Sequence, residues 1–270
     1  MLLTGGPLGN LNFLVAFLEN IIVSTTFKTS AVQGSGTFRP TFARAVGGLP
    51  LQWTFPDANN TLGSATHSGD LPAGFTFTLA GTKNVVVNVL DWDSFVQINA
   101  INCNLVDEGI ILDSKSKALT ILRLDNNQLT TPPNLQGLAA LTILRLDNNQ
   151  LTTPPNLQGL AALTILLLHS NQLTTPPNLQ GLAALTQLHL QYNQLTTPPN
   201  LQGLAALTHL YLYNNQLTTP SIDVLLQSCI DGGKSICDLR FDANPGSGGA
   251  SEALKTTLKT SPRFWTTNPA

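Results

Sequence analysis

Charge is scarce in this chain of 270 residues. Lys, Arg, Asp and Glu make up 10% of it, whereas ordinary soluble domains carry about 25%, and the formal net charge is −2. Nucleic acids and anionic membrane surfaces attract a clustered excess of Lys and Arg, so the composition indicates no nucleic-acid partner. A weakly charged surface rich in Thr and Asn is more typical of extracellular or particle-assembled proteins than of cytosolic enzymes. We therefore expect a virion, extracellular or cell-surface location.

Cysteine is also rare, with only Cys103, Cys229 and Cys237. Three residues do not provide a disulfide framework, and their spacing matches no zinc-binding pattern. Cys229 and Cys237 can pair if the fold brings them together. The alternative is that all three are buried free thiols. The sequence predicts no metal site and no cofactor.

No apolar run is long enough to cross a membrane. The N-terminal sequence MLLTGGPLGNLNFLVAFLENIIVS is apolar, but Glu19 and Asn20 interrupt it before it reaches the ~20 residues of a spanning helix. A signal peptide begins with basic residues, and the first Lys here is Lys28. We therefore expect a folded or partner-packing segment, with no membrane insertion and no cleavable signal peptide. A protein working outside a cell then needs another route, such as incorporation into a virus particle.

Catalytic motifs are missing as well. The sequence shows no Gly-rich phosphate-binding loop, no nucleophile elbow and no recognisable pair of buried carboxylates. The Gly-containing stretches SGDLPAG and NPGSGG are typical of turns. We expect no catalytic residues and no enzymatic activity.

Repetition is what the chain has in abundance. Five copies of a 22-residue unit follow one another from Leu119, and the first two, residues 119–140 and 141–162, are identical. Each copy follows the pattern L-x-x-L-x-L-x-x-N-x-L. Its Leu122 and Leu124 alternate inward around an outward Arg123, as strand geometry requires. One such unit cannot bury its own leucines, so successive copies must stack.

The pattern resembles the 22-residue class of the leucine-rich repeat family over roughly residues 95 to 245. The resemblance implies an α/β solenoid with a parallel β-sheet on a concave side and mostly 3₁₀ or polyproline returns on a convex side. The Asn of each copy is expected to form a buried ladder that satisfies the backbone where the chain turns: Asn127, Asn149, Asn171, Asn193 and Asn215. The TTPPN segment excludes a regular helix at its centre.

Both ends of this domain are typical of caps. We assign residues 95–270 to the leucine-rich repeat domain, divided into an N-terminal cap repeat (95–118), five repeats (119–228) and a C-terminal cap (229–270). The N-terminal cap repeat is a degenerate copy that keeps these residues on the pattern: Phe95, Ile98, Ala100, Cys103 and Leu105. Cys103 falls in the Asn column, where the family also accepts Cys, so a structural role is implied.

The C-terminal cap is expected to contain two helices and a strand. The segment SIDVLLQSCIDGG predicts a helix with Ser221 as N-cap, ended by Gly232 or Gly233. A last strand, ICDLRFDAN, keeps the pattern with Ile236, Leu239, Phe241 and Asn244. Residues 251–262 then predict a closing helix with Ser251 as N-cap, and Phe264 and Trp265 are expected to seal the final layer.

Residues 1–94 have a different character. Short Val/Phe/Thr runs such as LQWTF and KNVVVNVL, broken by Gly, Pro and Asn, predict a small antiparallel β-sandwich. Residues 53–89 resemble a PKD domain, through the segments WTFPD, THS and GTKNV, although Pro56 and Ala58 stand where that family has glycines. The resemblance implies an extracellular β domain. We expect residues 1–94 to anchor the protein or to bind an assembly partner.

The five copies differ from one another at very few positions. With the first Leu as offset 0, copies three to five depart from the first two only at offsets 2, 4, 6 and 7, until the return of the last copy changes. Offsets 2, 4 and 6 point away from the leucine core, with offset 7 beside them. Random drift would also have changed Thr120, Gln128, Thr130 and Gln136, whose counterparts are constant up to that return. We therefore predict that this surface has diversified to bind a partner.

The variable surface holds all three tyrosines of the chain and three of its four histidines. Tyrosine provides a large, stiff contact and is enriched in binding surfaces. His169, His189 and His209 lie on a diagonal, with roughly 8 Å between neighbouring Cα atoms, which is too far apart for a metal site. The predicted partner-binding residues are Arg123, Asp125, Arg145, Asp147, Leu167, His169, Gln187, His189, Gln191, Tyr192, His209, Tyr211, Tyr213 and Asn214.

Together these patterns predict a non-enzymatic recognition or adhesion protein. Its partner is a protein or a glycan on a cell surface, since Tyr and His also stack on sugar rings. A phage host-recognition component of a virion fits the composition and the diversified surface. The alternatives are a secreted bacterial surface adhesin and a scaffolding subunit whose concave face holds an assembly neighbour.

Overall fold

The computed structural model describes seven strands between residues 23 and 111, then residues 118–231 and 238–249. Of the side chains in the first seven strands, only Ile98 and Leu105 are described. Several sequence predictions fall outside this part of the chain: the apolar N-terminal segment, Ala100, Cys103, Ile236, Cys237, both glycines proposed to end the helix, and everything predicted for residues 251–270.

The N-terminal region contributes an antiparallel sheet. Its five strands are β1 (Val23–Ala31), β3 (Gln52–Thr54), β4 (Thr66–Ser68), β5 (Gly81–Val89) and β7 (Leu105–Ile111). They lie in the order β4-β3-β5-β1-β7, and each neighbouring pair runs antiparallel. Antiparallel pairing agrees with the prediction from the broken Val/Phe/Thr runs.

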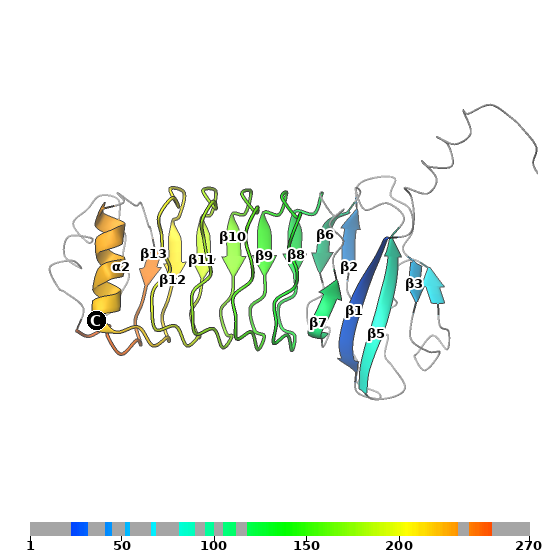
Figure 1. Ribbon diagram of the computed structural model, residues 1–270, viewed down its shortest axis with the longest axis horizontal. Coiled ribbons are helices and arrows are strands. Elements are labelled where there is room, and N and C mark those ends of the chain that lie inside the picture. Colours follow the sequence, from blue (N-terminus) through cyan, green and yellow to red (C-terminus); the bar gives the residue numbers. More distant parts are fainter. Residues whose placement is uncertain are drawn as a thin grey trace, which may run out of the picture.

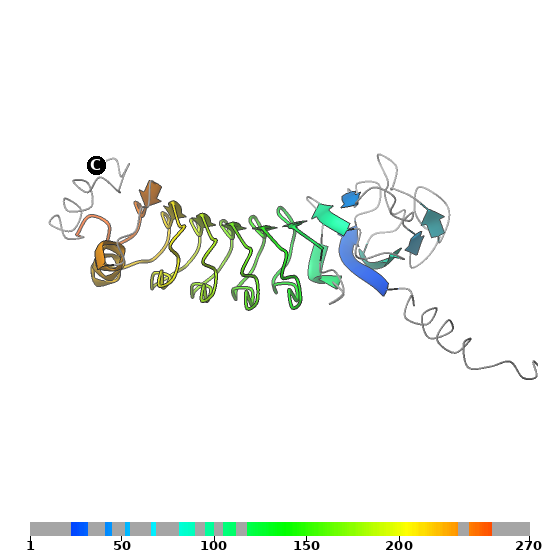
Figure 2. The ribbon, with the colours of Figure 1, turned by 90° about the horizontal axis from the view of Figure 1, so that it is seen from above.

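The repeats form a second sheet that is parallel over most of its width (Figure 1). It contains β6 (Phe95–Asn99), β8 (Ile121–Arg123), β9 (Ile143–Arg145), β10 (Ile165–Leu167), β11 (Gln187–His189), β12 (His209–Tyr211) and β13 (Asp238–Arg240). Neighbouring strands from β8 to β12 are in register with a shift of one repeat, so that Leu122, Leu144 and Leu166 align. Figure 2 shows the strands along one side of the solenoid and the returns along the other.

Two strands connect the two regions. β2 (Thr41–Arg44) pairs antiparallel with β6 and thereby joins the edge of the repeat sheet, whereas β7 of the cap repeat pairs with β1 of the N-terminal sheet. Ile98 aligns with Leu122, and the backbone N–H of Leu105 binds the ladder residue Asn127. This alignment confirms the predicted register of the cap repeat. The domain boundary at residue 94 remains a prediction, and two strand pairings, β2 with β6 and β1 with β7, join residues on either side of it.

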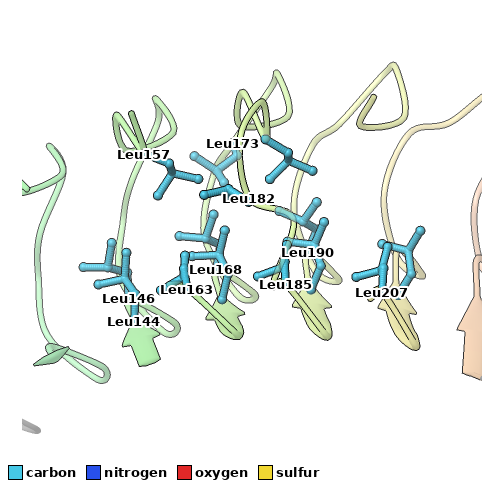
Figure 3. Packing of buried hydrophobic residues seen from close by; sticks show 14 of the residues in the cluster. Leu144, Leu146, Leu157, Leu163, Leu168, Leu173, Leu182, Leu185, Leu190 and Leu207 are labelled. Atoms are coloured by element: carbon cyan, nitrogen blue, oxygen red, sulfur yellow. The ribbon is translucent and has the colours of Figure 1, made fainter. Parts of the chain in front are cut away.

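The interior between the strands and the returns is almost pure leucine. Leucines of the strands (Leu144 and Leu146) and of the returns (Leu157 and Leu182) are at most 2% exposed and contact their counterparts in the next repeat (Figure 3). Each fully buried leucine contributes about 1.5–3 kcal/mol through the hydrophobic effect. Because every repeat adds the same set, the solenoid is stable only as a stack.

A ladder of buried asparagines runs beside the leucine core, as predicted. Asn171, which is 8% exposed, accepts a hydrogen bond from the backbone N–H of Leu151 at 2.9 Å. Its amide group donates to the carbonyl oxygens of Leu146 and Leu168 at 3.0 and 3.1 Å. The same arrangement recurs at Asn149, Asn193, Asn215 and Asn244. One side chain per repeat therefore satisfies backbone groups of two neighbouring copies.

The returns of the first four repeats contain turns instead of a regular helix. Gly159 has a φ of 86°, and the N–H of Leu160 donates to the carbonyl of Leu157 at 3.2 Å. A glycine with positive φ at the third position of a hydrogen-bonded turn indicates a type II β-turn. Gly137, Gly181 and Gly203 repeat the geometry. This requirement explains why the glycine of the return is constant among these copies.

The last return is a true helix, α2 (Thr219–Asp231), which begins earlier than predicted. The carbonyl of Thr218 accepts the N–H of Ile222 at 3.0 Å, and the Thr218 hydroxyl lies 3.1 Å from that of Ser221. The predicted N-cap Ser221 is therefore wrong, and Thr218 is the cap. Pro220 is accommodated because the N–H groups of the first turn have no intrahelical partner. Cys229 lies buried in this helix.

Candidate functional site

The variable positions form one continuous surface, here called the sheet face, which consists of the side chains at offsets 2, 4, 6 and 7 from β8 to β13. At offsets 2 and 4 these side chains are half-buried, with a fully buried leucine between them in every strand from β8 to β12. The predicted residues Leu167, Gln187, His189, His209 and Tyr211 occupy these positions. The structure therefore brings the predicted partner-binding positions together on one side of the solenoid.

The last strand extends the sheet face by four residues that the sequence analysis missed. Asp238 and Arg240 of β13 align with His209 and Tyr211, which places Asp242 at offset 6 and Ala243 at offset 7. The sequence carried a signal, because RFD in DLRFDAN repeats the RLD of the first copies. Both ends of the sheet face thus carry Arg and Asp.

Offset 6 differs from the prediction. Asp125, Asp147 and Gln191 are only 2%, 1% and 7% exposed, so the expectation that these side chains face solvent is wrong. Each strand ends at offset 4, and the residue at offset 7 has a positive φ. Strand alternation no longer applies beyond offset 4, and these side chains turn back toward the sheet. Their low exposure leaves these three side chains little surface for direct contact, so their predicted role in partner binding stays a prediction.

The two buried carboxylates are part of a ladder of ion pairs at the N-terminal end of the sheet face. Arg123 Nε lies 3.4 Å from Asp125, and Arg145 Nε lies 3.6 Å from Asp125 and 3.2 Å from Asp147. His169 Nε2 continues the ladder at 3.4 Å from Asp147. The expectation that the chain has no paired buried carboxylates is therefore wrong. Both acids bind donors of their own chain, which fixes the stacked Arg123 and Arg145.

Histidines occupy the middle of the sheet face. The ring centroids of His169 and His189 are 6.3 Å apart, and those of His189 and Tyr211 are 4.5 Å apart. Burial, helped by the neighbouring His169 and His209, lowers the pKa of His189 to about 4. Burial also lowers the pKa of His169, against the opposing effect of Asp147. Among the described residues no group of three His, Cys, Asp or Glu side chains is placed to hold a metal ion.

Tyrosines dominate the C-terminal end. Tyr211 donates a 2.7 Å hydrogen bond to Asp238, and the guanidinium carbon of Arg240 lies 5.2 Å from the centre of its ring. Burial and this hydrogen bond raise the pKa of Tyr211 to about 12. Tyr192 and Tyr213 pack at 5.3 Å with their ring planes 79° apart. The result is a packed aromatic cluster in which the raised pKa keeps the Tyr211 ring neutral at physiological pH.

Tyr192 has the least favourable backbone of this cluster. Every residue at offset 7 has a φ between 50° and 58°, a left-handed conformation that Asn tolerates and bulky residues rarely adopt. Asn126, Asn148 and Asn214 suit it, and Ser170 and Ala243 are small, whereas Tyr192 is bulky and its side chain is 53% exposed. A strained residue that also exposes a large ring is typical of a functional position.

The lowered pKa of His189 makes stability depend on pH. In the unfolded chain the imidazole titrates near 6.5, and in the folded chain near 4, so the unfolded state binds more protons between these values. Stability is therefore full above pH 6.5 and is lost as pH falls toward 4. We expect the thermal midpoint to drop less between pH 7 and pH 4.5 in His189→Gln than in the wild type, as measured by circular dichroism. Equal drops in both proteins would contradict this assignment.

A second candidate site lies on the opposite side of the solenoid. A groove of about 470 Å³ runs between the return at residues 197–200 and helix α2, where Val224 is 65% exposed. Its lining is Thr, Ser, Pro, Asn, Val and Leu and includes no ionisable side chain. It offers less chemistry for specific recognition than the sheet face does. We therefore take the sheet face as the functional site.

Comparison with known proteins identifies the repeats. A two-copy model described as leucine-rich repeats matches residues 183–225, and a single-repeat model matches residues 118–138 and 140–160. None of these segments lies in residues 1–94, so the resemblance to PKD domains is not supported. No curated protein matches the chain. No helix among the described residues is both long and apolar enough to span a membrane.

Solved structures include 66 similar chains. One is an internalin from Listeria monocytogenes str. 4b F2365, with 20% sequence identity and a TM-score of 0.41. The match covers 58% of this chain and 49% of the internalin, so the present chain spans about half of that protein. The repeat pattern, the parallel sheet and the asparagine ladder, together with the family matches, show that the repeat region of this chain consists of leucine-rich repeats.

Proposed function

We propose that this chain is a non-enzymatic recognition protein that binds a protein partner through the sheet face. The observation that carries the proposal is the aromatic cluster of His189, Tyr192, Tyr211 and Tyr213, which joins two successive copies on one accessible surface. Tyr and Arg are the residues that most often dominate binding energy at interfaces. The ion-pair ladder holds Arg123 and Arg145, and the bond to Asp238 holds Tyr211, before binding, so these side chains lose little conformational entropy on association.

The proposed setting is the surface of a virion or a cell. The low charge and the sheet-face variation between copies support a host-recognition component of a phage or a bacterial adhesin. In either case residues 1–94 would supply the attachment to an assembly partner, since β2 and β7 join the repeat sheet to the N-terminal sheet. A scaffolding subunit would use the same surface for a neighbour in the assembly.

The proposal is tested by selection against the immobilised protein. A displayed library of random 12-residue peptides is selected for binding, and an array of defined oligosaccharides is probed in parallel. The variant Tyr192→Ala/Tyr211→Ala/Tyr213→Ala is expected to bind the selected peptides at least about 100-fold more weakly, as expected for several interface hot spots.

The matched control is Gln158→Ala/Gln180→Ala/Gln202→Ala, which changes exposed side chains of the returns and should leave peptide binding unchanged. Circular dichroism verifies that both variants are folded. Selected peptides that bind the triple tyrosine variant as tightly as the wild type would refute recognition through the sheet face. If oligosaccharides bind in a tyrosine-dependent manner and no peptide binds, the proposed partner is a glycan and not a protein.

A further inference from the structure

We infer that the C-terminal end of the sheet face contains a subsite for a cationic side chain of the partner, formed by Tyr192, Tyr213 and the carboxylate of Asp242. The inference rests on the proposed function and specifies its chemistry. The partner would present an Arg or a Lys at this position. Three independent features of the described residues support it.

The first feature is an unpaired carboxylate. In β8 and β9 the arginine at offset 4 pairs with the aspartate at offset 6 of its own repeat, as Arg123 does with Asp125. Arg240 instead turns to Asp238 at offset 2, with two hydrogen bonds of 2.9 and 3.0 Å. Within residues 118–231 and 238–249, no ion pair or side-chain hydrogen bond satisfies the Asp242 carboxylate. It is half-buried, so it can still be reached from solvent.

The second feature is the aromatic surface beside this carboxylate. β12 and β13 are in register, so Tyr213 and Asp242 lie opposite each other at offset 6, and the backbone N–H of Asn214 donates to the carbonyl of Asp242 at 3.1 Å. Tyr192 stands nearly perpendicular to Tyr213, with a ring-plane angle of 79°. Two rings at this angle form a corner whose walls include a negative π-face, the geometry used by aromatic cages that bind cations.

The third feature is a guanidinium group that the chain itself places on this cluster. Arg240 lies over the neighbouring Tyr211 ring at 5.2 Å, within the distance at which cation–π attraction is significant. Tyr211 is thus already occupied, whereas among the described residues no arginine or lysine lies over the ring of Tyr192 or Tyr213, although Arg240 is near enough to Tyr213 to influence its pKa. The corner between Tyr192 and Tyr213 is where a cationic side chain of the partner could pack, as Arg240 packs on Tyr211.

The charge balance favours a cation over an anion at this end. β13 and the residues after it bring Asp238, Arg240 and Asp242 to the sheet face. These three side chains together carry one net negative charge. An acidic side chain of the partner would meet Asp242 without a compensating group, because Arg240 already binds Asp238 through two nitrogens. The N-terminal end, with Arg123 and Arg145 against Asp125 and Asp147, is balanced.

The test uses the three tyrosines of the chain as reporters. The full-length protein is labelled selectively at the Tyr rings, which gives three ring signals, and is titrated with the N-acetyl amides of Arg, Lys, Gln and Glu. We expect the Arg and Lys derivatives to shift the Tyr192 and Tyr213 signals with dissociation constants at least about fivefold lower than that of the Gln derivative. The Tyr211 signal should move less, because Arg240 covers its ring.

Asp242→Asn is expected to weaken binding of the Arg derivative about fivefold. The control variant, Asp223→Asn on α2, removes the same charge away from the sheet face and should leave the constant unchanged. Equal shifts with the Arg and Gln derivatives, or equal constants for Asp242→Asn and wild type, would refute the subsite. If selected peptides still depend on the tyrosines in that case, the proposed function stands and only the cation subsite is wrong.

Discussion

Replacing Asn171 by Ala is expected to lower the free energy of unfolding by about 3 kcal/mol. The substitution leaves the buried N–H of Leu151 without an acceptor. Such an unsatisfied donor costs about 1–3 kcal/mol, and the lost amide leaves a cavity in addition. The carbonyl of Leu168 keeps a second donor in Asn193, so the loss does not extend to every bond of the ladder. Urea unfolding followed by circular dichroism measures the change.

Gln172→Ala is the matched control for this prediction. Gln172 is the next residue, its side chain is exposed, and its backbone N–H donates to the carbonyl of Leu151. Its replacement should change the free energy of unfolding by less than about 0.5 kcal/mol. A loss below about 1 kcal/mol in Asn171→Ala would show that water replaces the side chain and that the ladder is not a major source of stability.

The features that the sequence predicted correctly are those fixed by local packing conditions. Leu122 and Leu124 must point inward together for a strand to cover the core, and the asparagine of the ladder must follow at the turn. The degenerate cap repeat obeys the same conditions, which is why Ile98 and Leu105 could be placed without identity to the other copies. The spacing of these residues is therefore sufficient to predict their neighbours.

The errors arose where a local rule stopped applying. Alternation placed Asp125 and Asp147 in solvent, but the strands end at offset 4, and the two carboxylates lie buried against Arg123 and Arg145. The pairing of β2 with β6 joins residues about 50 positions apart, and no periodicity signals it. The rotamer of Arg240, which chooses Asp238 over Asp242, depends on the neighbouring Tyr211 and is invisible to a pattern.

Tyr192→Asn is expected to weaken binding of the selected peptides about 30-fold or more without lowering the thermal midpoint of the protein. The loss of a hot-spot ring costs about 2 kcal/mol of binding free energy, which corresponds to this factor. Folding gains about 1–2 kcal/mol because Asn suits the left-handed backbone at φ 56°. It loses about 0.5–1.5 kcal/mol of the edge contact with Tyr213, so the midpoint should stay level or rise. Surface plasmon resonance and differential scanning calorimetry measure the two quantities.

The reverse substitution, Asn148→Tyr, measures the backbone cost together with the loss of one hydrogen bond to Asp147. Asn148 has a φ of 54°, is exposed, and binds Asp147 through its amide at 3.0 Å. A tyrosine there would meet only the smaller ring of His169, at the position that Tyr213 holds beside Tyr192, so the strain is less fully offset and stability should fall by about 1–2 kcal/mol. If Asn148→Tyr is neutral and Tyr192→Asn lowers the midpoint, Tyr192 is a packing residue of the repeat. If both behave as expected while peptide binding falls, the chain retains a strained tyrosine at a cost in stability because the ring is needed for recognition.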